Sequence, residues 1–98
     1  MSHRLILRPA ALGDIAAIGD WYDQRSDVLR DAFLSAVHAA LAQVAQNPFQ
    51  YQAVYRQYRR VPVSRFPYAL FYIVSDSEII VIACIHGHRN LTQALRRR

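Results

Sequence analysis

The second half of the chain, from Asn47 to Arg89, constrains the fold most strongly, because a helix stop there is followed by three strand-like runs. Asn47 and Pro48 end a helix, since proline cannot continue one and disfavours helical geometry in the residue before it. The three runs are Tyr58–Val63, Tyr68–Val74 and Ile79–Ile85. Alternating side chains in the second run, and the Ser75-Asp76-Ser77 turn after it, predict that the last two runs form a hairpin.

The first half predicts one short strand and two helices. Arg4–Arg8 has strand-like alternation and is ended by Pro9. Apolar residues at helical spacing predict a helix over Ala10–Arg25 and a second one from a cap at Ser26 or Asp27 to Asn47. The expected fold is α+β with the order β-α-α-β-β-β, in which the helical hairpin covers one face of an antiparallel three-strand C-terminal sheet.

The remaining segments predict a loop, a C-terminal tail and the two faces of the sheet. We expect Phe49–Tyr55 to be a loop and Leu91–Arg98 to be a short basic tail with a helical turn. The sheet face opposite the helices is then free to form a concave surface lined by arginine side chains. Ile79–Ile85 is apolar at every position, which predicts a central strand covered on both faces.

Length and composition limit the class of protein. The 98 residues fit a single domain spanning 1–98, and an apolar content of 53% excludes a disordered chain. The longest apolar run has seven residues, far short of the ~20 needed to span a membrane, and the N-terminus lacks a signal-peptide pattern. The single Cys84 excludes an internal disulfide and fits a reducing compartment, so we expect a cytoplasmic protein with no membrane partner.

Charge is unevenly distributed along the chain. Residues 1–54 have four arginines and five acids, a net charge of −1, whereas residues 55–98 have eight arginines and two acids, a net charge of +6. All twelve basic residues are arginine, whose planar fork of donors matches phosphate or carboxylate. This asymmetry indicates a nucleic acid or an acidic protein as partner, or a solvated basic face.

Motifs along nearly the whole chain resemble those of the RelE/ParE superfamily of type II toxins. The matching positions are Tyr22, Phe33, Asn47-Pro48, Arg59-Arg60, Arg65-Phe66-Pro67-Tyr68 with Tyr72, and Ile85-His86-Gly87-His88-Arg89. The resemblance implies the growth-inhibiting toxin component of a toxin-antitoxin system, of the kind that stabilises plasmids. It also implies a hetero-oligomer with an adjacently encoded antitoxin, whose acidic C-terminal segment would bind the basic half and an exposed apolar groove.

Members of the superfamily act on two different targets. Its ParE-like members poison DNA gyrase and need no catalytic residues, whereas its RelE-like members cut messenger RNA in the ribosomal A site. The chain has no lysine, its one glutamate, Glu78, lies in the predicted hairpin turn, and no tyrosine follows His86. These departures favour a non-catalytic gyrase poison. The alternatives are a ribosome-dependent, metal-free mRNA endoribonuclease and an inactive binding module that retains the fold.

Four arginines are the candidate target-binding residues: Arg59, Arg60, Arg65 and Arg89. If the protein is an RNase, then His86, Arg65 and Arg89 are the catalytic candidates, because cleavage needs cationic donors on the phosphate and a group that moves protons near neutral pH. Adjacent strand residues point to opposite faces, so Arg59 and Arg60 cannot both enter one site.

Other candidates are expected to be structural. His86 and His88 could share a strand face, but no third ligand is placed by spacing, so we expect no metal site and no cofactor. Cys84 is expected to be a small core residue. Trp21 is expected to lie in the core or in a contact on a helix face. Three tyrosines near the arginines are expected to cover a sheet edge, with base stacking as the alternative: Tyr51, Tyr55 and Tyr58.

Overall fold

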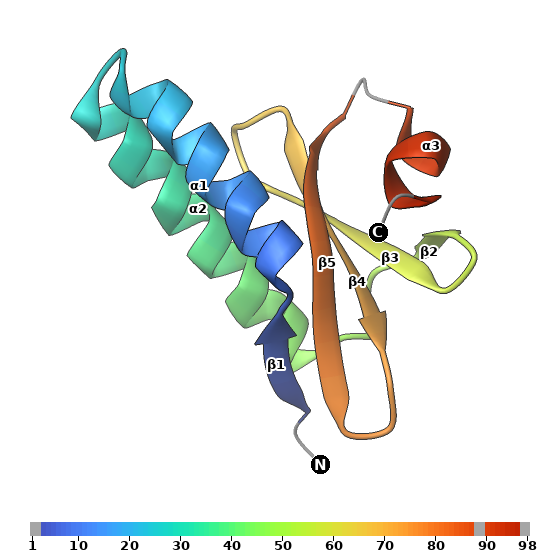
Figure 1. Ribbon diagram of the computed structural model, residues 1–98. Helices are drawn as coiled ribbons and strands as arrows, with labels where there is room; N and C mark the ends of the chain where they lie inside the picture. The colour runs from blue at the N-terminus through green and yellow to red at the C-terminus, as the bar shows by residue number, and fades with distance from the viewer. Residues whose placement is uncertain (1–2, 88–89, 97–98) are drawn as a thin grey trace.

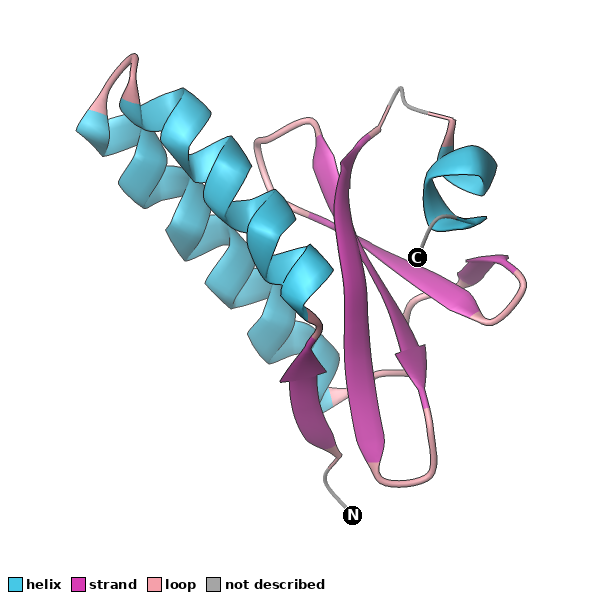
Figure 2. Cartoon of the chain, viewed as in Figure 1, coloured by secondary structure: helices cyan, strands magenta, loops and turns pink. Residues whose placement is uncertain are grey.

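A helical hairpin packs against one face of a twisted sheet in the computed structural model, which describes residues 3–87 and 90–96 (Figures 1 and 2). The elements in chain order are β1 (Arg4–Leu7), α1 (Pro9–Asp23), α2 (Asp27–Gln46), β2 (Ala53–Tyr55), β3 (Tyr58–Pro62), β4 (Tyr68–Val74), β5 (Glu78–His86) and α3 (Leu91–Arg96). The α+β class and the order of the predicted elements are confirmed.

The sheet has five strands in the order β1-β5-β4-β3-β2, so the prediction of a three-strand sheet is wrong. β1 joins it because its backbone groups find partners on the outer edge of β5: the Arg4 N–H donates to Ser77 O and the Arg8 N–H to Val81 O. This pairing is parallel, whereas the other three are antiparallel, which makes the sheet mixed. β5 lies between β1 and β4, which confirms the predicted inner strand.

β2 is the second difference, because Phe49–Tyr55 was expected to be a loop. Ala53–Tyr55 pairs antiparallel with the start of β3 across a tight turn. Arg56 has the left-handed backbone angle (φ 49°) that this turn requires. Ala53 and Val54 are both exposed, so the three-residue strand has no alternation of buried and exposed positions that a sequence pattern could reveal.

The two long helices begin and end where the sequence indicates. Pro9 is the first residue of α1, where its missing N–H costs nothing. The Ser26 hydroxyl caps α2 by accepting from the Val28 N–H at 3.2 Å. Asn47 ends α2 with an extended backbone (φ −151°) instead of the left-handed one that asparagine tolerates, because Pro48 follows it.

The main core lies between the hairpin and the sheet. The four buried side chains of α2 pack there on the inward face of the strands: Phe33, Val37, Ala40 and Val44. The Tyr72 hydroxyl of β4 donates to Pro48 O at 2.6 Å, which ties the end of α2 to the sheet. In the part of the chain that the structure describes, α2 is the one helix whose length and mean hydropathy, 1.2, would suffice to cross a membrane. An alanine-rich helix that packs on a sheet has the same composition.

The opposite face of the sheet is not free, which corrects the expectation of an open concave surface there. α3 lies across it (Figure 1). Ala94 and Leu95 are buried among apolar side chains of β4 and β5, including Phe71 and Ile82. The predicted tail therefore forms a second, smaller core. The alternation of β4 requires this cover, because Ala69 and Phe71 point away from the hairpin.

Candidate functional site

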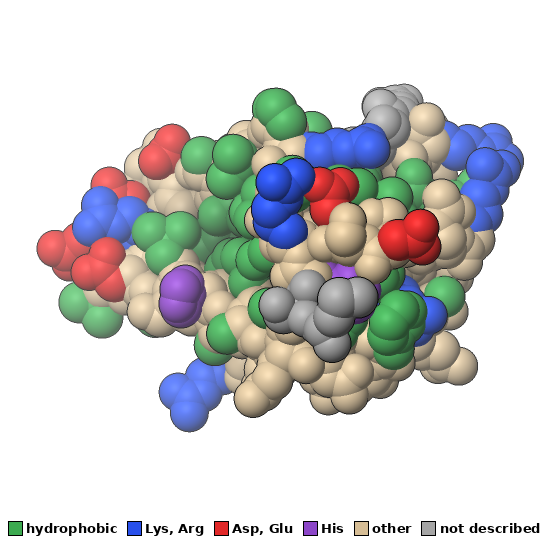
Figure 3. Space-filling view, turned by 90° about the horizontal axis from the view of Figure 1, so that it is seen from below, with side chains coloured by type: hydrophobic (Ala, Val, Ile, Leu, Met, Phe, Trp, Pro, Cys, Tyr) green, Lys and Arg blue, Asp and Glu red, His purple; other side chains and the backbone are tan. Residues whose placement is uncertain are grey.

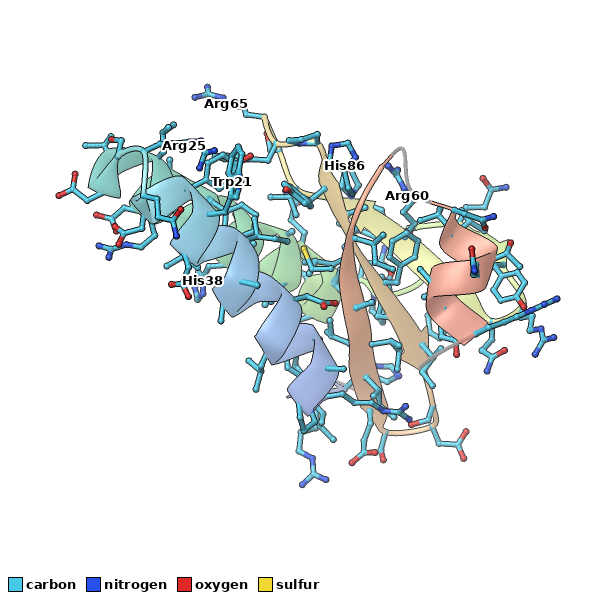
Figure 4. The ribbon with its side chains drawn as sticks, turned by 45° about the horizontal axis from the view of Figure 1, so that its top comes forward. Trp21, Arg25, His38, Arg60, Arg65 and His86 are labelled. Atoms are coloured by element: carbon cyan, nitrogen blue, oxygen red, sulfur yellow. The ribbon has the colours of Figure 1, made fainter. Side chains whose placement is uncertain are left out.

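Most candidate residues gather at one end of the sheet, where β5 ends beside the start of β4. His86 lies opposite Tyr68 in the strand register. The Gly87 N–H then donates to Pro67 O at 2.8 Å, which holds the end of β5 against the β3–β4 connection. Figure 4 shows Arg60, Arg65 and His86 at this end of the molecule. His88 and Arg89 lie outside the described residues, so the prediction for Arg89 stays a prediction.

Arg59 points to the hairpin side of the sheet and has a structural environment. Its Nη1 donates to Tyr51 O at 2.6 Å, and its guanidinium lies 5.1 Å from the centre of the Phe49 ring. These contacts hold the segment that follows α2 against β3. The guanidinium of Arg59 therefore has partners within the fold.

Arg60 points to the opposite face. It pairs in register with Phe71, which belongs to the α3 side of the sheet. Its Nη2 would lie 3.9 Å from a Cβ placed on Gly87. Arg60 is therefore at the His86 end of the sheet but on the face away from His86. As predicted, Arg59 and Arg60 do not share a site.

Arg65 lies in the β3–β4 connection and is exposed. Its backbone is left-handed (φ 73°), which is uncommon for a residue with a side chain. The next residue explains this conformation, because the Phe66 ring packs against Tyr22 and Phe33 at centroid distances of 5.2 and 5.4 Å. Phe66 fixes the connection to the helical hairpin and leaves the Arg65 side chain at the surface.

His86 lines a pocket of about 210 Å³ between α1 and the end of β5. The lining residues are Asp14, Ala17, Ile18, Tyr68, Cys84, Ile85 and His86. The His86 ring packs edge-on against Tyr68, with 5.3 Å between centroids. The Asp14 carboxylate accepts from the Cys84 N–H at 3.0 Å. Burial, and then the charge of Asp14, raise the pKa of the Cys84 thiol to about 12, so this thiol stays protonated near neutral pH.

The described residues contain no group of three or more His, Cys, Asp or Glu side chains placed to hold a metal ion. The three tyrosines named as edge-covering residues do lie at or near a sheet edge. Tyr55 and Tyr58 stack in parallel across the β2–β3 pair, 6.0 Å apart, and pack against the α3 core. Tyr51 packs against the main core and donates to Gln43 Oε1.

Charged groups are unevenly distributed over the surface. Acidic side chains gather at the tip of the helical hairpin, on the left in Figure 3, where Arg30 forms ion pairs with Asp23 and Asp31. Basic side chains gather on the side of the sheet, on the right in the same view. This arrangement follows the charge asymmetry between the two halves of the chain.

The predictions did not include a function for two residues near the hairpin tip, Trp21 and Arg25. The Arg25 guanidinium carbon lies 3.4 Å from the centre of the Trp21 ring, and 48% of Trp21 is exposed. Trp21 lies in the last turn of α1 and Arg25 just after its end, and this spacing of four residues was the signal that could have identified the pair.

The comparisons with known proteins agree with this architecture. A family model described as the ParE toxin of the type II toxin-antitoxin system parDE matches residues 5–91. A solved structure titled as the chromosomal ParDE toxin-antitoxin system from P. aeruginosa has a TM-score of 0.67 and 22% identity, covering 87% of this chain and 96% of that chain.

A second similar structure is the YoeB dimer from Staphylococcus aureus, with a TM-score of 0.60 and 16% identity over 88% of this chain and 98% of that chain. At these identities the two structures establish likeness of fold alone. No curated protein matches the chain.

Proposed function

The chain belongs to the family of ParE toxins of type II toxin-antitoxin systems, and from this premise we propose that it stops bacterial growth by poisoning DNA gyrase. It is the toxin component, and its partner is an antitoxin protein. The gyrase target is our inference. The single observation that supports it is the separation of two groups that RNA cleavage could use, Arg60 and His86, on opposite faces of the sheet.

Metal-free RNA cleavage requires cationic donors on the phosphate and a proton-transferring group on the same surface. Arg60 and His86 lie on opposite faces of the sheet. The His86 ring packs against Tyr68 in the pocket beside α1. Of the described candidates, Arg60 and His86 therefore do not share one face of the sheet. A protein that acts by contact needs only exposed arginines such as Arg65, which favours gyrase poisoning over the endoribonuclease alternative.

The antitoxin would bind the apolar surface of the helical hairpin. Five large apolar side chains are exposed on α1 and α2: Leu12, Trp21, Val28, Leu29 and Leu34. So many on one hairpin is typical of a surface that a partner covers. The hairpin lies in the half of the chain with a net charge of −1, so an acidic segment of the same partner would bind the second half, which has a net charge of +6. We propose that toxin and antitoxin form a hetero-oligomer in the cytoplasm, and that the toxin alone is poorly soluble or lethal on expression.

Tightly induced expression in a bacterial host tests the target directly. Pulse labelling of DNA and protein synthesis should show early loss of DNA synthesis and an SOS response. In a supercoiling assay with purified gyrase, Arg60→Gln and Arg65→Gln should each weaken inhibition at least about tenfold, the usual effect of losing a charge-assisted contact. The matched control is Arg8→Gln. Arg8 is exposed and lies directly before the first residue of α1, and its replacement should leave inhibition at the wild-type level.

Other results would support one of the two alternative functions. Early loss of protein synthesis with messenger RNA cut at codons would establish an endoribonuclease, and His86→Ala should then abolish cleavage. Normal growth at high expression of folded protein would indicate an inactive binding module.

A further inference from the structure

The β2–β3 turn and α3 together present a basic surface that the proposed function does not use. Arg56 lies in the turn and Arg96 is the last residue of α3, and both side chains are exposed. The turn and α3 lie on the same side of the molecule, on the right in Figure 1, and basic side chains gather on the right in Figure 3. Among the described residues, neither arginine has an ion-pair partner. Both guanidinium groups are therefore available to a ligand.

The backbone of Arg56 has an unusual conformation for an arginine. Its φ of 49° is left-handed, a region that glycine adopts without penalty and other residues seldom enter. Non-glycine residues in such conformations are concentrated at binding sites, where the surrounding structure enforces them. The guanidinium carbon of Arg56 lies 5.2 Å from the centre of the Tyr55 ring, which stacks on Tyr58 with 6.0 Å between centroids and 7° between planes. The turn therefore holds the Arg56 guanidinium at the surface, beside a fixed aromatic pair.

The two tyrosines support the arginine but are poorly placed to stack on a base. Both rings are partly buried and pack against the α3 core. The Tyr55 hydroxyl oxygen is buried as well. Bases stack on aromatic rings whose faces are open to solvent. The base-stacking alternative for Tyr55 and Tyr58 is therefore disfavoured, and the surface fits the phosphates of a nucleic acid better than its bases.

Charge and polarity around the arginines favour the backbone of a nucleic acid over an acidic protein. The two acidic residues that follow Asp31 in the sequence, Asp76 and Glu78, lie at or beside the β4–β5 turn, and Glu78 pairs with Arg4. Val54 is the one large apolar side chain exposed among the described residues of β2, β3 and α3. This surface therefore lacks the apolar centre that a protein interface needs. A DNA duplex carries one negative charge about every 1.7 Å and is bound at its phosphates by cations and polar donors.

We propose that Arg56 and Arg96 form a second binding site of this toxin, for the phosphate backbone of double-stranded DNA. Each guanidinium would donate to phosphate oxygens, and such contacts carry no sequence information, so the site would accept any duplex. DNA binding by the toxin alone requires no gyrase. The use of the site in growth arrest rests on the proposed function: a toxin bound to DNA would be held beside a gyrase that acts on the same DNA, which raises its effective concentration there.

Fluorescence anisotropy of a labelled duplex of mixed sequence, titrated with the full-length protein over a series of salt concentrations, tests the site. Arg56→Gln and Arg96→Gln should each weaken binding about tenfold at about 50 mM salt. Each should also make the slope of log K against log salt shallower by about 0.9, the value for one phosphate contact. Arg56→Lys keeps the charge and should keep the slope. Arg56→Gly should lose binding like Arg56→Gln although it relieves the left-handed backbone, so misfolding could not explain the loss.

The matched control is Arg8→Gln, which removes the same charge from an exposed position. Arg8 lies between β1 and α1, and β1 and β2 are the opposite edges of the sheet, four strand spacings of about 4.8 Å apart. Its loss should change binding by less than about twofold, because salt screens charges separated by more than about 10 Å. Polyglutamate should compete more weakly than unlabelled DNA of equal total charge, since its charges are about 3.3 Å apart instead of about 1.7 Å.

Three results would overturn the inference: no binding of duplex DNA by wild type, equal losses of affinity from Arg8→Gln and Arg56→Gln, or an unchanged salt slope in Arg56→Gln. Much tighter binding of duplex RNA than of duplex DNA, or competition by polyglutamate as strong as that by DNA, would also overturn it. The occupant would then be an RNA or an acidic protein.

Inhibition of gyrase supercoiling by wild type, measured in parallel, separates the two proposals. If wild type binds DNA with the expected ranking of variants but does not inhibit gyrase, the gyrase proposal fails and the DNA site stands. If wild type inhibits gyrase and the ranking fails, only this inference is overturned.

Discussion

Arg65 combines a strained backbone with an exposed side chain, so its two properties can be separated by mutation. Its φ of 73° costs a residue with a Cβ about 1 kcal/mol relative to glycine. Arg65→Gly and Arg65→Ala both remove the guanidinium, but only glycine removes the strain. We expect the glycine variant to exceed the alanine variant in free energy of unfolding by about 1 kcal/mol, measured by urea denaturation.

Both variants should lose inhibition of the target equally if the guanidinium is the functional group. Equal stabilities of the two variants would show that the left-handed conformation is not retained in solution. A difference in inhibition between them would mean that the backbone of the loop, and not the side chain, contacts the target.

Because of Tyr72, the free energy of unfolding depends on pH in the alkaline range. Burial raises the pKa of Tyr72 to about 12 from an ordinary value of 10.0. Between these values the unfolded chain loses the phenolic proton while the folded chain keeps it, so the folded state binds more protons and stability falls as pH rises. Cys84 acts in the same direction, with a pKa raised to about 12 from 9.0 by burial and then by Asp14.

We therefore expect the melting temperature to fall between about pH 9 and pH 12, the range set by these two groups. Tyr72→Phe should flatten the part of this fall above pH 10.0, because the residue no longer titrates. The same variant should lower the free energy of unfolding by about 1–2 kcal/mol at neutral pH, since Pro48 O loses a buried donor. An unchanged alkaline profile in Tyr72→Phe would assign the fall to other groups.

At the scale of elements, Asp14 connects α1 to β5 where β1 no longer covers the strand edge. The last described pair of β1 with β5 is Leu7 with Val81, and Cys84 lies beyond it. The Asp14 carboxylate accepts from the Cys84 N–H at 3.0 Å and so replaces the missing strand. Such a contact satisfies a backbone donor that would otherwise be buried without a partner.

Asp14→Ala should lower the free energy of unfolding by about 1–3 kcal/mol, the cost of leaving that donor unsatisfied. Asp14→Asn keeps an oxygen acceptor and serves as the matched control, with a smaller loss. Amide hydrogen exchange at Cys84 should accelerate in the alanine variant and much less in the asparagine variant. Equal exchange rates in the three proteins would exclude the carboxylate as the partner of this amide in solution.

The elements that the sequence predicted are those with a periodic apolar pattern or a defined boundary. α2 has a continuous apolar stripe with a serine cap and an Asn-Pro stop, and β4 is apolar along its length. β2 was missed because its pairing depends on β3 and not on its own pattern. α3 has six residues, too few to be stable alone, so its helix depends on burial of Ala94 and Leu95 on the sheet.

At the scale of the whole molecule, the candidate site depends on which face of the sheet each side chain takes. The alternation of strand residues predicted that Arg59 and Arg60 diverge. It could not place His86 relative to Arg60, because a register shift within the β4–β5 pair changes which residues share a face. The Trp21–Arg25 contact was readable as a four-residue spacing, but its exposure depends on how α1 docks on the sheet.

The second face of the sheet is covered by α3, and mutation of the buried side chains of α3 tests whether this packing stabilises the fold. Leu95 is 2% exposed and packs with Phe71 and Ile82. Leu95→Ala should lower the free energy of unfolding by about 2–3 kcal/mol, the low end for a core leucine because α3 is short and can adjust. For a domain of this size that is a large share of the total stability, which is about 5–15 kcal/mol. Thr92→Ala, an exposed change on the same helix, is the matched control and should stay within about 0.5 kcal/mol.

The same pair of variants distinguishes a docked α3 from an undocked one. If α3 covers the sheet in solution, Leu95→Ala should expose Phe71 and Ile82 part of the time and increase binding of an apolar dye, while Thr92→Ala should not. Because the exposed face is a continuous apolar surface of β4 and β5, the leucine variant should also associate at high concentration, which light scattering would detect. Equal stability and equal dye binding of the two variants would mean that the sheet face is open, as the sequence had first indicated.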